Sequence, residues 1–154
     1  EARLLLEPRV AYEAALNADP EKYEKFKALL EEEKHCYCTG DMDIYEINEE
    51  LHFGIAAMAD NPYLERCIKQ VFWRTQLYVF FFDTFYMDSC NRGQIMDPEL
   101  SIGHREHAGI IDAIFCRNGE KAETLMKEHV LSTFNMLTAN AGFRYFLGGS
   151  KQRL

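Results

Sequence analysis

The sequence predicts an all-α protein, an antiparallel bundle of about six to seven helices. Strand signals are nearly absent, because apolar and polar residues rarely alternate and β-branched residues are not grouped between turn residues. Helix-starting residues stand before a proline or an acidic first turn at several points. Short connections between these segments favour antiparallel packing of consecutive helices. A chain of 154 residues is long enough for one domain with its own core.

The boundaries define six helices in chain order. Their starting signals are Asp19-Pro20-Glu21, Gly40-Asp41, Asn61-Pro62, Asp97-Pro98-Glu99 and Asn118-Gly119-Glu120. The predicted helices cover residues 2–18, 20–38, 41–59, 62–88, 98–117 and 119–139. Pro8 either kinks the first helix or marks its true start, because proline lacks a backbone N–H. Residues 88–97 form the one sizeable predicted loop.

The charge balance argues against direct binding of nucleic acid. Lys and Arg total 17 against 25 Asp and Glu, a net charge of −8, whereas nucleic-acid-binding domains carry a basic patch or stripe. The apolar stretch at residues 71–85 is interrupted by polar side chains and is shorter than the ~20 residues that span a bilayer, so we expect no membrane span. Five cysteines and no secretory signal favour a cytoplasmic location. Because the first residue is Glu1 rather than Met, we expect a fragment of a longer protein.

Histidines recur on the inward stripes of three predicted helices. In the third helix, Asn48 and His52 lie four residues apart beside an apolar stripe, so both side chains can reach one ion. His107 and His129 lie on the inward stripes of the fifth and sixth helices. Three buried imidazoles are costly unless each nitrogen is paired, and a shared metal pairs all three. The alternative from spacing alone is three core histidines that hydrogen-bond to other protein groups.

Three histidines and one oxygen ligand with open positions suit Zn, Ni, Mn or Fe, and the spacing does not distinguish these metals. His104 lies one turn from His107 and is the substitute ligand or an effector contact. Arg3 and Arg74 lie near apolar positions, where a guanidinium either pairs with an acidic residue or binds an anionic ligand. The isolated cysteines, including Cys67, Cys90 and Cys116, are expected to be buried small hydrophobic residues.

The fourth predicted helix is apolar on more than one side. Its apolar side chains are Val71, Phe72, Leu77, Tyr78, Val79, Phe80, Phe81, Phe82 and Phe85. A bundle of this size does not cover them all, so we expect a homodimer that buries part of this aromatic surface. The first helix is the rival interface element.

Short motifs occur along the chain in a fixed order. Arg3-Leu4-Leu5-Leu6-Glu7 opens the first helix, and Asn48-Glu49-Glu50-Leu51-His52 precedes Asn61-Pro62-Tyr63-Leu64. Glu106-His107 is followed by Ile110, Ala113 and Ile114, and then by Ala122, Met126 and His129. Together these motifs resemble the FCD family, the ligand-sensing C-terminal domain of FadR-subfamily GntR transcription regulators. The resemblance covers nearly the whole chain and implies one effector-binding domain over residues 1–154.

The resemblance implies a helical bundle whose central cavity holds a divalent metal and a small organic acid. Carried over by position, the metal ligands are Asn48, His52, His107 and His129. Asp is the commoner residue of the family at position 48, and an amide oxygen lacks the charge that helps to hold a cation. In the family, a DNA-binding winged-helix domain precedes the FCD domain, and residues 1–154 do not include it. We therefore expect DNA to be bound only through the winged-helix domain.

Three functions follow as hypotheses. The first is a sensor in which a small carboxylate, held between the metal and Arg3 or Arg74, shifts the arrangement of two protomers and so controls DNA binding. The second is a metal-dependent enzyme acting on a small organic acid, with Glu49 or Glu106 as the base. The third is an interaction module whose histidines belong to the core. We favour the sensor hypothesis. Under it, we expect the chain not to be an enzyme and to have no catalytic residues.

Overall fold

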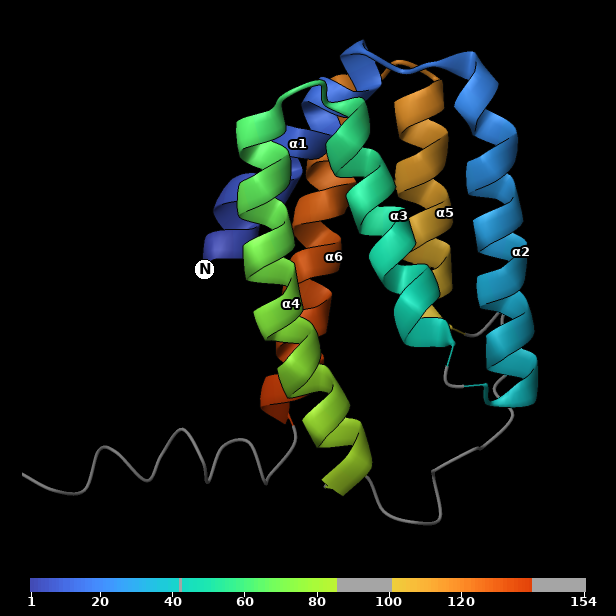
Figure 1. Cartoon of the computed structure of the whole chain (residues 1–154), viewed down its shortest axis with the longest axis vertical. Helices are drawn as coiled ribbons and strands as arrows, with labels where there is room; N and C mark the ends of the chain where they lie inside the picture. Colours follow the sequence, from blue (N-terminus) through green and yellow to red (C-terminus); the bar gives the residue numbers. More distant parts are fainter. Residues whose placement is uncertain (42, 86–100, 140–154) are drawn as a thin grey trace, which may run out of the picture.

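The computed structural model describes residues 1–41, 43–85 and 101–139, and this part of the chain forms six α-helices and no strand. The helices are α1 (Ala2–Leu16), α2 (Tyr23–Thr39), α3 (Ile44–Met58), α4 (Pro62–Phe85), α5 (Ile102–Phe115) and α6 (Gly119–Ala139). Consecutive helices run in opposite directions (Figure 1). The predicted all-α class is confirmed. The loop predicted at residues 88–97 lies outside the described residues.

Two predicted helix starts are capped by asparagine side chains. Asn61 Oδ1 accepts hydrogen bonds from the backbone N–H groups of Tyr63 and Leu64, both at 3.1 Å. Asn118 Oδ1 accepts one from Lys121 N–H at 3.1 Å. These bonds pair N–H groups that a helix leaves without a partner in its first turn, so the caps fix where α4 and α6 begin.

Three other predicted helix starts are three or four residues too early, and one of them is the third helix, which begins at Ile44 instead of residue 41. Residues Pro20–Lys22 form a 3₁₀ turn, and α2 begins only at Tyr23. The fifth helix begins at Ile102 instead of residue 98, because Ser101 is extended and its hydroxyl accepts a hydrogen bond from His104 N–H at 3.3 Å. Pro8 lies inside α1 and does not mark its start.

The first helix lies along α6 and also contacts α3, α4 and α5, while α2 packs against α3 and α5. The apolar stripe that spacing predicts on α3 consists of Ile44, Ile47, Leu51, Ile55 and Met58; all of these are buried except Ile44, which is partly buried. The prediction of buried cysteines is wrong for Cys67 and Cys116, which are exposed, whereas Cys36 is buried. Cys90 lies outside the described residues.

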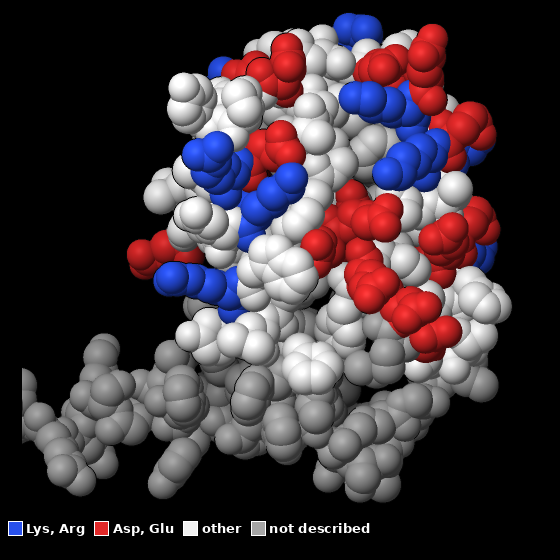
Figure 2. Space-filling model, viewed as in Figure 1, with Lys and Arg blue, Asp and Glu red and all other residues white. Residues whose placement is uncertain are grey.

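The two sides of the bundle differ in surface chemistry. Acidic side chains gather over α2 and α3, whereas the far end of α4 presents uncharged side chains (Figure 2). We call the exposed apolar residues of α4 between positions 73 and 80 the outer face of α4: Trp73, Leu77, Tyr78 and Phe80. Among the described helices, none combines the length and the apolar character that a membrane crossing requires.

Candidate metal and ligand site

Three helices each bring one predicted histidine to the same point inside the bundle. His52 of α3, His107 of α5 and His129 of α6 are buried, with exposed fractions of 2%, 5% and 5%. One ring nitrogen of each lies within 4.8 Å of the others. The ring centroids of His107 and His129 are 4.6 Å apart, and those of His52 and His129 are 5.2 Å apart. The structure therefore brings together three residues whose sequence separation is large.

Each of these histidines faces a glutamate through Nδ1. His107 Nδ1 lies 2.6 Å from Glu33 of α2, and His129 Nδ1 lies 2.9 Å from Glu106 of α5. His52 Nδ1 lies 2.8 Å from Glu7 of α1, which is ion-pair distance without the alignment of a hydrogen bond. We call these three histidines and three glutamates the histidine cluster.

The Nε2 atoms of His52 and His107 are buried and have no hydrogen-bond partner. Because each Nδ1 is already directed at a carboxylate, Nε2 is the nitrogen left to bind something else. An unpaired buried ring nitrogen carries a desolvation cost of about 1–3 kcal/mol. The cluster thus presents an arrangement that a ligand atom at its centre would complete.

The charge state of the cluster suits metal binding. Burial disfavours the charged imidazole, which lowers the pKa of His52 to about 4 and the pKa of His129 to about 3. Burial also acts to raise the pKa of Glu7 and of Glu33, but their contacts with histidines outweigh it and lower both pKa values. Arg3 contributes further to the lowered pKa of Glu7. Near neutral pH His52 and His129 are therefore neutral and Glu7 and Glu33 are ionised, and the neutral imidazole is the form that binds metals.

Arg3 of α1 links the cluster to the open space beside it. Its guanidinium pairs with Glu7 through both Nε and Nη2, the latter at 3.1 Å, and its Cζ lies 4.9 Å from the ring centroid of Phe72. A guanidinium has five N–H donors, so donors remain after the Glu7 pair. Arg3 is also among the residues that line the cavity next to the cluster. Both alternatives predicted for Arg3, an ion pair and a place at an anion site, are thus compatible.

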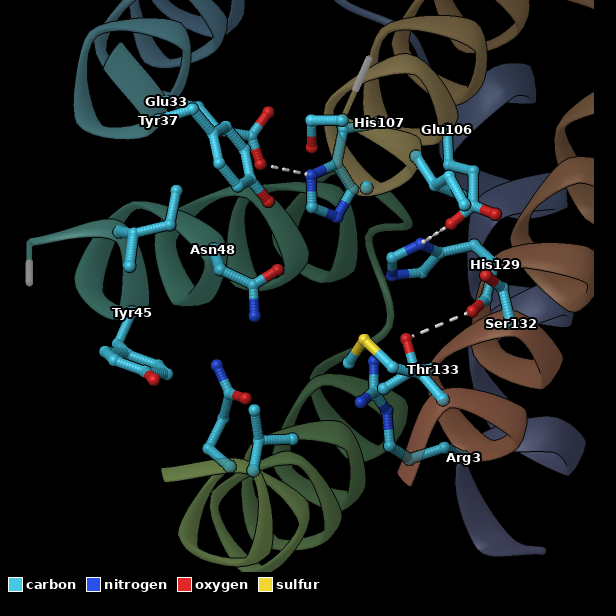
Figure 3. A pocket seen from close by; sticks show the side chains of 17 residues that line it. Arg3, Glu33, Tyr37, Tyr45, Asn48, Glu106, His107, His129, Ser132 and Thr133 are labelled. Atoms are coloured by element: carbon cyan, nitrogen blue, oxygen red, sulfur yellow. Dashed lines mark hydrogen bonds and ion pairs between the residues drawn. The ribbon is translucent and has the colours of Figure 1, made fainter. Parts of the chain in front are cut away.

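The cavity has a volume of about 520 Å³, within the range of about 300–1,000 Å³ typical of small-molecule sites. The side chains of Arg3, Asn48, His107 and His129 point into the same space (Figure 3). Gln76 of α4 also lines the cavity. Every described helix therefore contributes to the cluster or the cavity, which lies where the six helices converge.

The other predicted site residues are not among the three converging histidines. Arg74 is exposed on α4 and does not line the cavity. His104 Nδ1 lies 2.8 Å from Glu33, so His104 shares a carboxylate with His107 and is not part of the group of three converging nitrogens. Glu106, one of the two candidate bases, is hydrogen-bonded to His129, and the other, Glu49, does not line the cavity.

Sequence reasoning missed Glu7 and Glu33 as partners of the histidines. Glu33 lies in the buried stripe of α2 with Phe26, Leu29 and Cys36. A glutamate in an apolar stripe is rarely buried without a partner, so its position was a usable signal. For Glu7 the comparable signal was Arg3 four residues earlier on a helix of buried alanines.

Comparison with known proteins gives one match. Residues 1–132 match the family model described as FCD domain. None of the curated proteins matches the chain, and none of the solved structures matches it.

Proposed function

Because the chain belongs to the FCD domain family, the effector-binding regulatory domains of GntR-type regulators, we propose that it senses a small carboxylate through a divalent metal. The observation that carries this proposal is the convergence of three buried imidazoles, two with unpaired Nε2 atoms, beside a cavity that an arginine also lines.

His52, His107 and His129 would hold the metal through Nε2, and Asn48 is the proposed oxygen ligand from the same cavity. Glu7, Glu33 and Glu106 would orient the three rings, as carboxylates commonly do for metal-bound histidines. Three carboxylates against one guanidinium leave an excess of negative charge in the cluster, which a divalent cation offsets. The negative charge is on the glutamates, which are not themselves proposed metal ligands. It supports metal binding even though the proposed oxygen ligand, Asn48, is neutral. Zn, Ni, Mn and Fe all suit the donor set.

Arg3 would bind the effector's carboxylate, because its remaining N–H donors adjoin the cavity. A bound metal would supply a Lewis-acidic position for one carboxylate oxygen. Local positive groups are needed to bind the carboxylate, because the chain's net charge of −8 does not attract anions. The carboxylate would thus be held from α1 on one side and from the histidine cluster on the other.

Regulation would follow from the position of the site. Ligand contacts with α1, α3, α5 and α6 favour one arrangement of these helices, and a ligand shifts an equilibrium only by its differential affinity for the two states. We propose that two chains associate, and that this shift alters the spacing of DNA-binding domains outside residues 1–154.

The test is titration calorimetry of the chain, first stripped by a chelator and then loaded with zinc. We expect one zinc per chain, and butyrate binding that depends on zinc. The uncharged analogue butyramide should bind far more weakly. Arg3→Gln should weaken butyrate binding by about 10- to 100-fold through loss of charge-assisted hydrogen bonds. Arg9→Gln is the matched control, because Arg9 is exposed and pairs with Glu13 on the same helix.

Equal binding of butyrate and butyramide would contradict a carboxylate site, and no zinc uptake would contradict the metal site. Recovery of chemically unchanged butyrate after prolonged incubation distinguishes binding from turnover.

A further inference from the structure

The amide of Gln76 has no role in the histidine cluster. Gln76 is 9% exposed and lines the cavity from α4, and its Nε2 is buried without a hydrogen-bond partner. A buried, unpaired amide costs about 1–3 kcal/mol. Neither metal binding by the histidines nor carboxylate binding by Arg3 explains why a glutamine is placed there.

Helix geometry puts a second amide beside it. The rings of His52 in α3 and Phe72 in α4 are in contact, with centroids 4.8 Å apart. Asn48 lies one turn before His52 on α3, and Gln76 lies one turn after Phe72 on α4. Because α3 and α4 are antiparallel (Figure 1), both steps go the same way along the bundle. The two amides therefore face one region of the cavity, about 5.4 Å along the axis from the His52–Phe72 contact.

The charged residues that line the cavity determine which groups of an effector can bind beside the two amides. Among the described lining residues Arg3 is the one cation, and Glu33 and Glu106 are acidic. A second carboxylate on the effector would find no further cation there and would be repelled by both glutamates. An amide in either orientation offers both a donor and an acceptor. A hydroxyl also donates and accepts, so it pairs with two facing amides and brings no charge.

Resting on the proposed function, in which the Asn48 oxygen is a metal ligand, we infer that the Gln76 amide, together with the side-chain N–H of Asn48, binds a hydroxyl of the effector. The effector is therefore a hydroxylated monocarboxylic acid. The hydroxyl is several bonds from the carboxylate, because Gln76 lies one helical turn, about 5.4 Å, along α4 from Phe72, whose ring contacts His52, and a carbon–carbon bond spans only about 1.5 Å. Thr133 adds another hydroxyl to the lining; it donates to the carbonyl of His129 at 3.1 Å and keeps its oxygen able to accept.

The test uses acids that differ only at the end remote from the carboxylate. Butyrate, 4-hydroxybutyrate and succinate carry a methyl, a hydroxyl and a second carboxylate there, and hexanoate, 6-hydroxyhexanoate and adipate repeat the comparison on a longer chain. Calorimetry on the zinc-loaded chain should give the hydroxy acid at least ~10-fold tighter binding than the other two in one of the series.

Gln76→Met keeps the length of the side chain and removes its hydrogen-bonding groups. We expect it to abolish the preference for the hydroxy acid over butyrate and to leave the zinc stoichiometry at one per chain, because Gln76 is not among the proposed metal ligands. Gln70→Met is the matched control, because Gln70 is exposed on the same helix, and it should keep the preference.

Two results would overturn the inference while leaving the proposed function intact: succinate or adipate binding most tightly, or Gln76→Met weakening all the acids equally. If zinc binds but none of the six acids does, both the inference and the proposed carboxylate effector fail. The panel on the unmodified chain decides the matter even if Gln76→Met does not fold.

Discussion

The histidine cluster and the outer face of α4 depart from the usual distribution of side chains in opposite directions. Inside the bundle, Glu7 and Glu33 are 2% and 1% exposed, although glutamate is rarely fully buried. On the outside, Trp73 and Leu77 are 57% and 58% exposed. Charge lies where apolar residues are expected, and apolar residues lie where charge is expected.

Neither region is explained by the stability of a single chain. Replacing a buried ion pair with apolar residues is often neutral or stabilising. An apolar core at the position of the cluster would therefore be expected to be at least as stable. Exposed aromatic side chains contribute little to folding until they are covered. The proposed function accounts for both regions through binding, of a metal and a ligand in one case and of a second chain in the other. The predictions below separate these two roles, from the largest expected effect to the smallest.

Removing one histidine should abolish metal binding without affecting association. His52→Ala and His107→Ala should each lose stoichiometric zinc, because two imidazoles and a neutral amide are a poor set for a divalent ion. Elemental analysis after dialysis measures this. His35→Ala is the matched control, since His35 is exposed on α2. Unchanged zinc content in both cluster variants would show that the metal site lies elsewhere.

A charge on the outer face of α4 should dissociate the proposed dimer and leave the cluster intact. Burial of a leucine is worth about 1.5–3 kcal/mol, and two-fold symmetry repeats the loss, so Leu77→Glu should weaken association by about 3 kcal/mol or more. Sedimentation at micromolar concentration measures this, and zinc content should stay unchanged.

Leu5→Glu tests the rival interface on α1, where Leu5 is 78% exposed. Dissociation by Leu5→Glu but not by Leu77→Glu would transfer the interface to α1. A monomer in the unmodified chain would count against both interfaces.

Glu33→Gln should weaken zinc binding without abolishing it. Loss of the carboxylate partner of a metal-bound histidine typically costs 10- to 100-fold in affinity, and Glu33 lies 2.6 Å from His107 Nδ1. Competition with a zinc chelator measures the change. The exposed neighbour Glu32 gives the control Glu32→Gln. Equal affinity in Glu33→Gln and the unmodified chain would mean that Glu33 serves only the fold.

The sequence predicted where the helices lie along the chain better than it predicted which helices and side chains pack together. Asn61 and Asn118 act locally, within three residues of the N–H groups that they cap, so their effect is visible in a short segment. Ser101 caps α5 in the same way, but Asp97-Pro98 offered a stronger local signal and gave the wrong start. The outward direction of Arg74 depended on how α4 packs, which periodicity left open.

The residues of the site show more clearly that sequence periodicity does not predict contacts between helices. The helical stripes selected His52, His107 and His129 because periodicity tells which face of a helix is buried. Glu33 and His107 are 74 residues apart, and only the packing of α2 against α5 brings them together. Periodicity places a residue on a face, but the residue opposite it depends on the crossing of two helices. The stripe of α2 could mark Glu33 as buried, but which histidine it contacts was beyond the reach of the sequence pattern.

Mild acid should destabilise the metal-free chain through the histidine cluster and not through the outer face of α4. The pKa of His52 is lowered to about 4 and that of His129 to about 3, whereas both are near 6.5 in an unfolded chain. Between these values the unfolded state binds protons that the folded state does not, so the free energy of unfolding decreases as the pH falls. The loss is at most about 1.4 kcal/mol per pH unit for each histidine.

The window from pH 6.5 to about 4.5 separates the histidines from Glu7 and Glu33, because the lowered pKa values of these two glutamates remove further stability only as the pH falls below the ordinary glutamate value of 4.5. Denaturant unfolding at several pH values, with the chelator present, measures the slope. His52→Leu should reduce the slope, because it removes one of the two groups, and Leu77→Glu should keep it. A slope in this window that His52→Leu leaves unchanged would mean that the acid sensitivity arises outside the cluster.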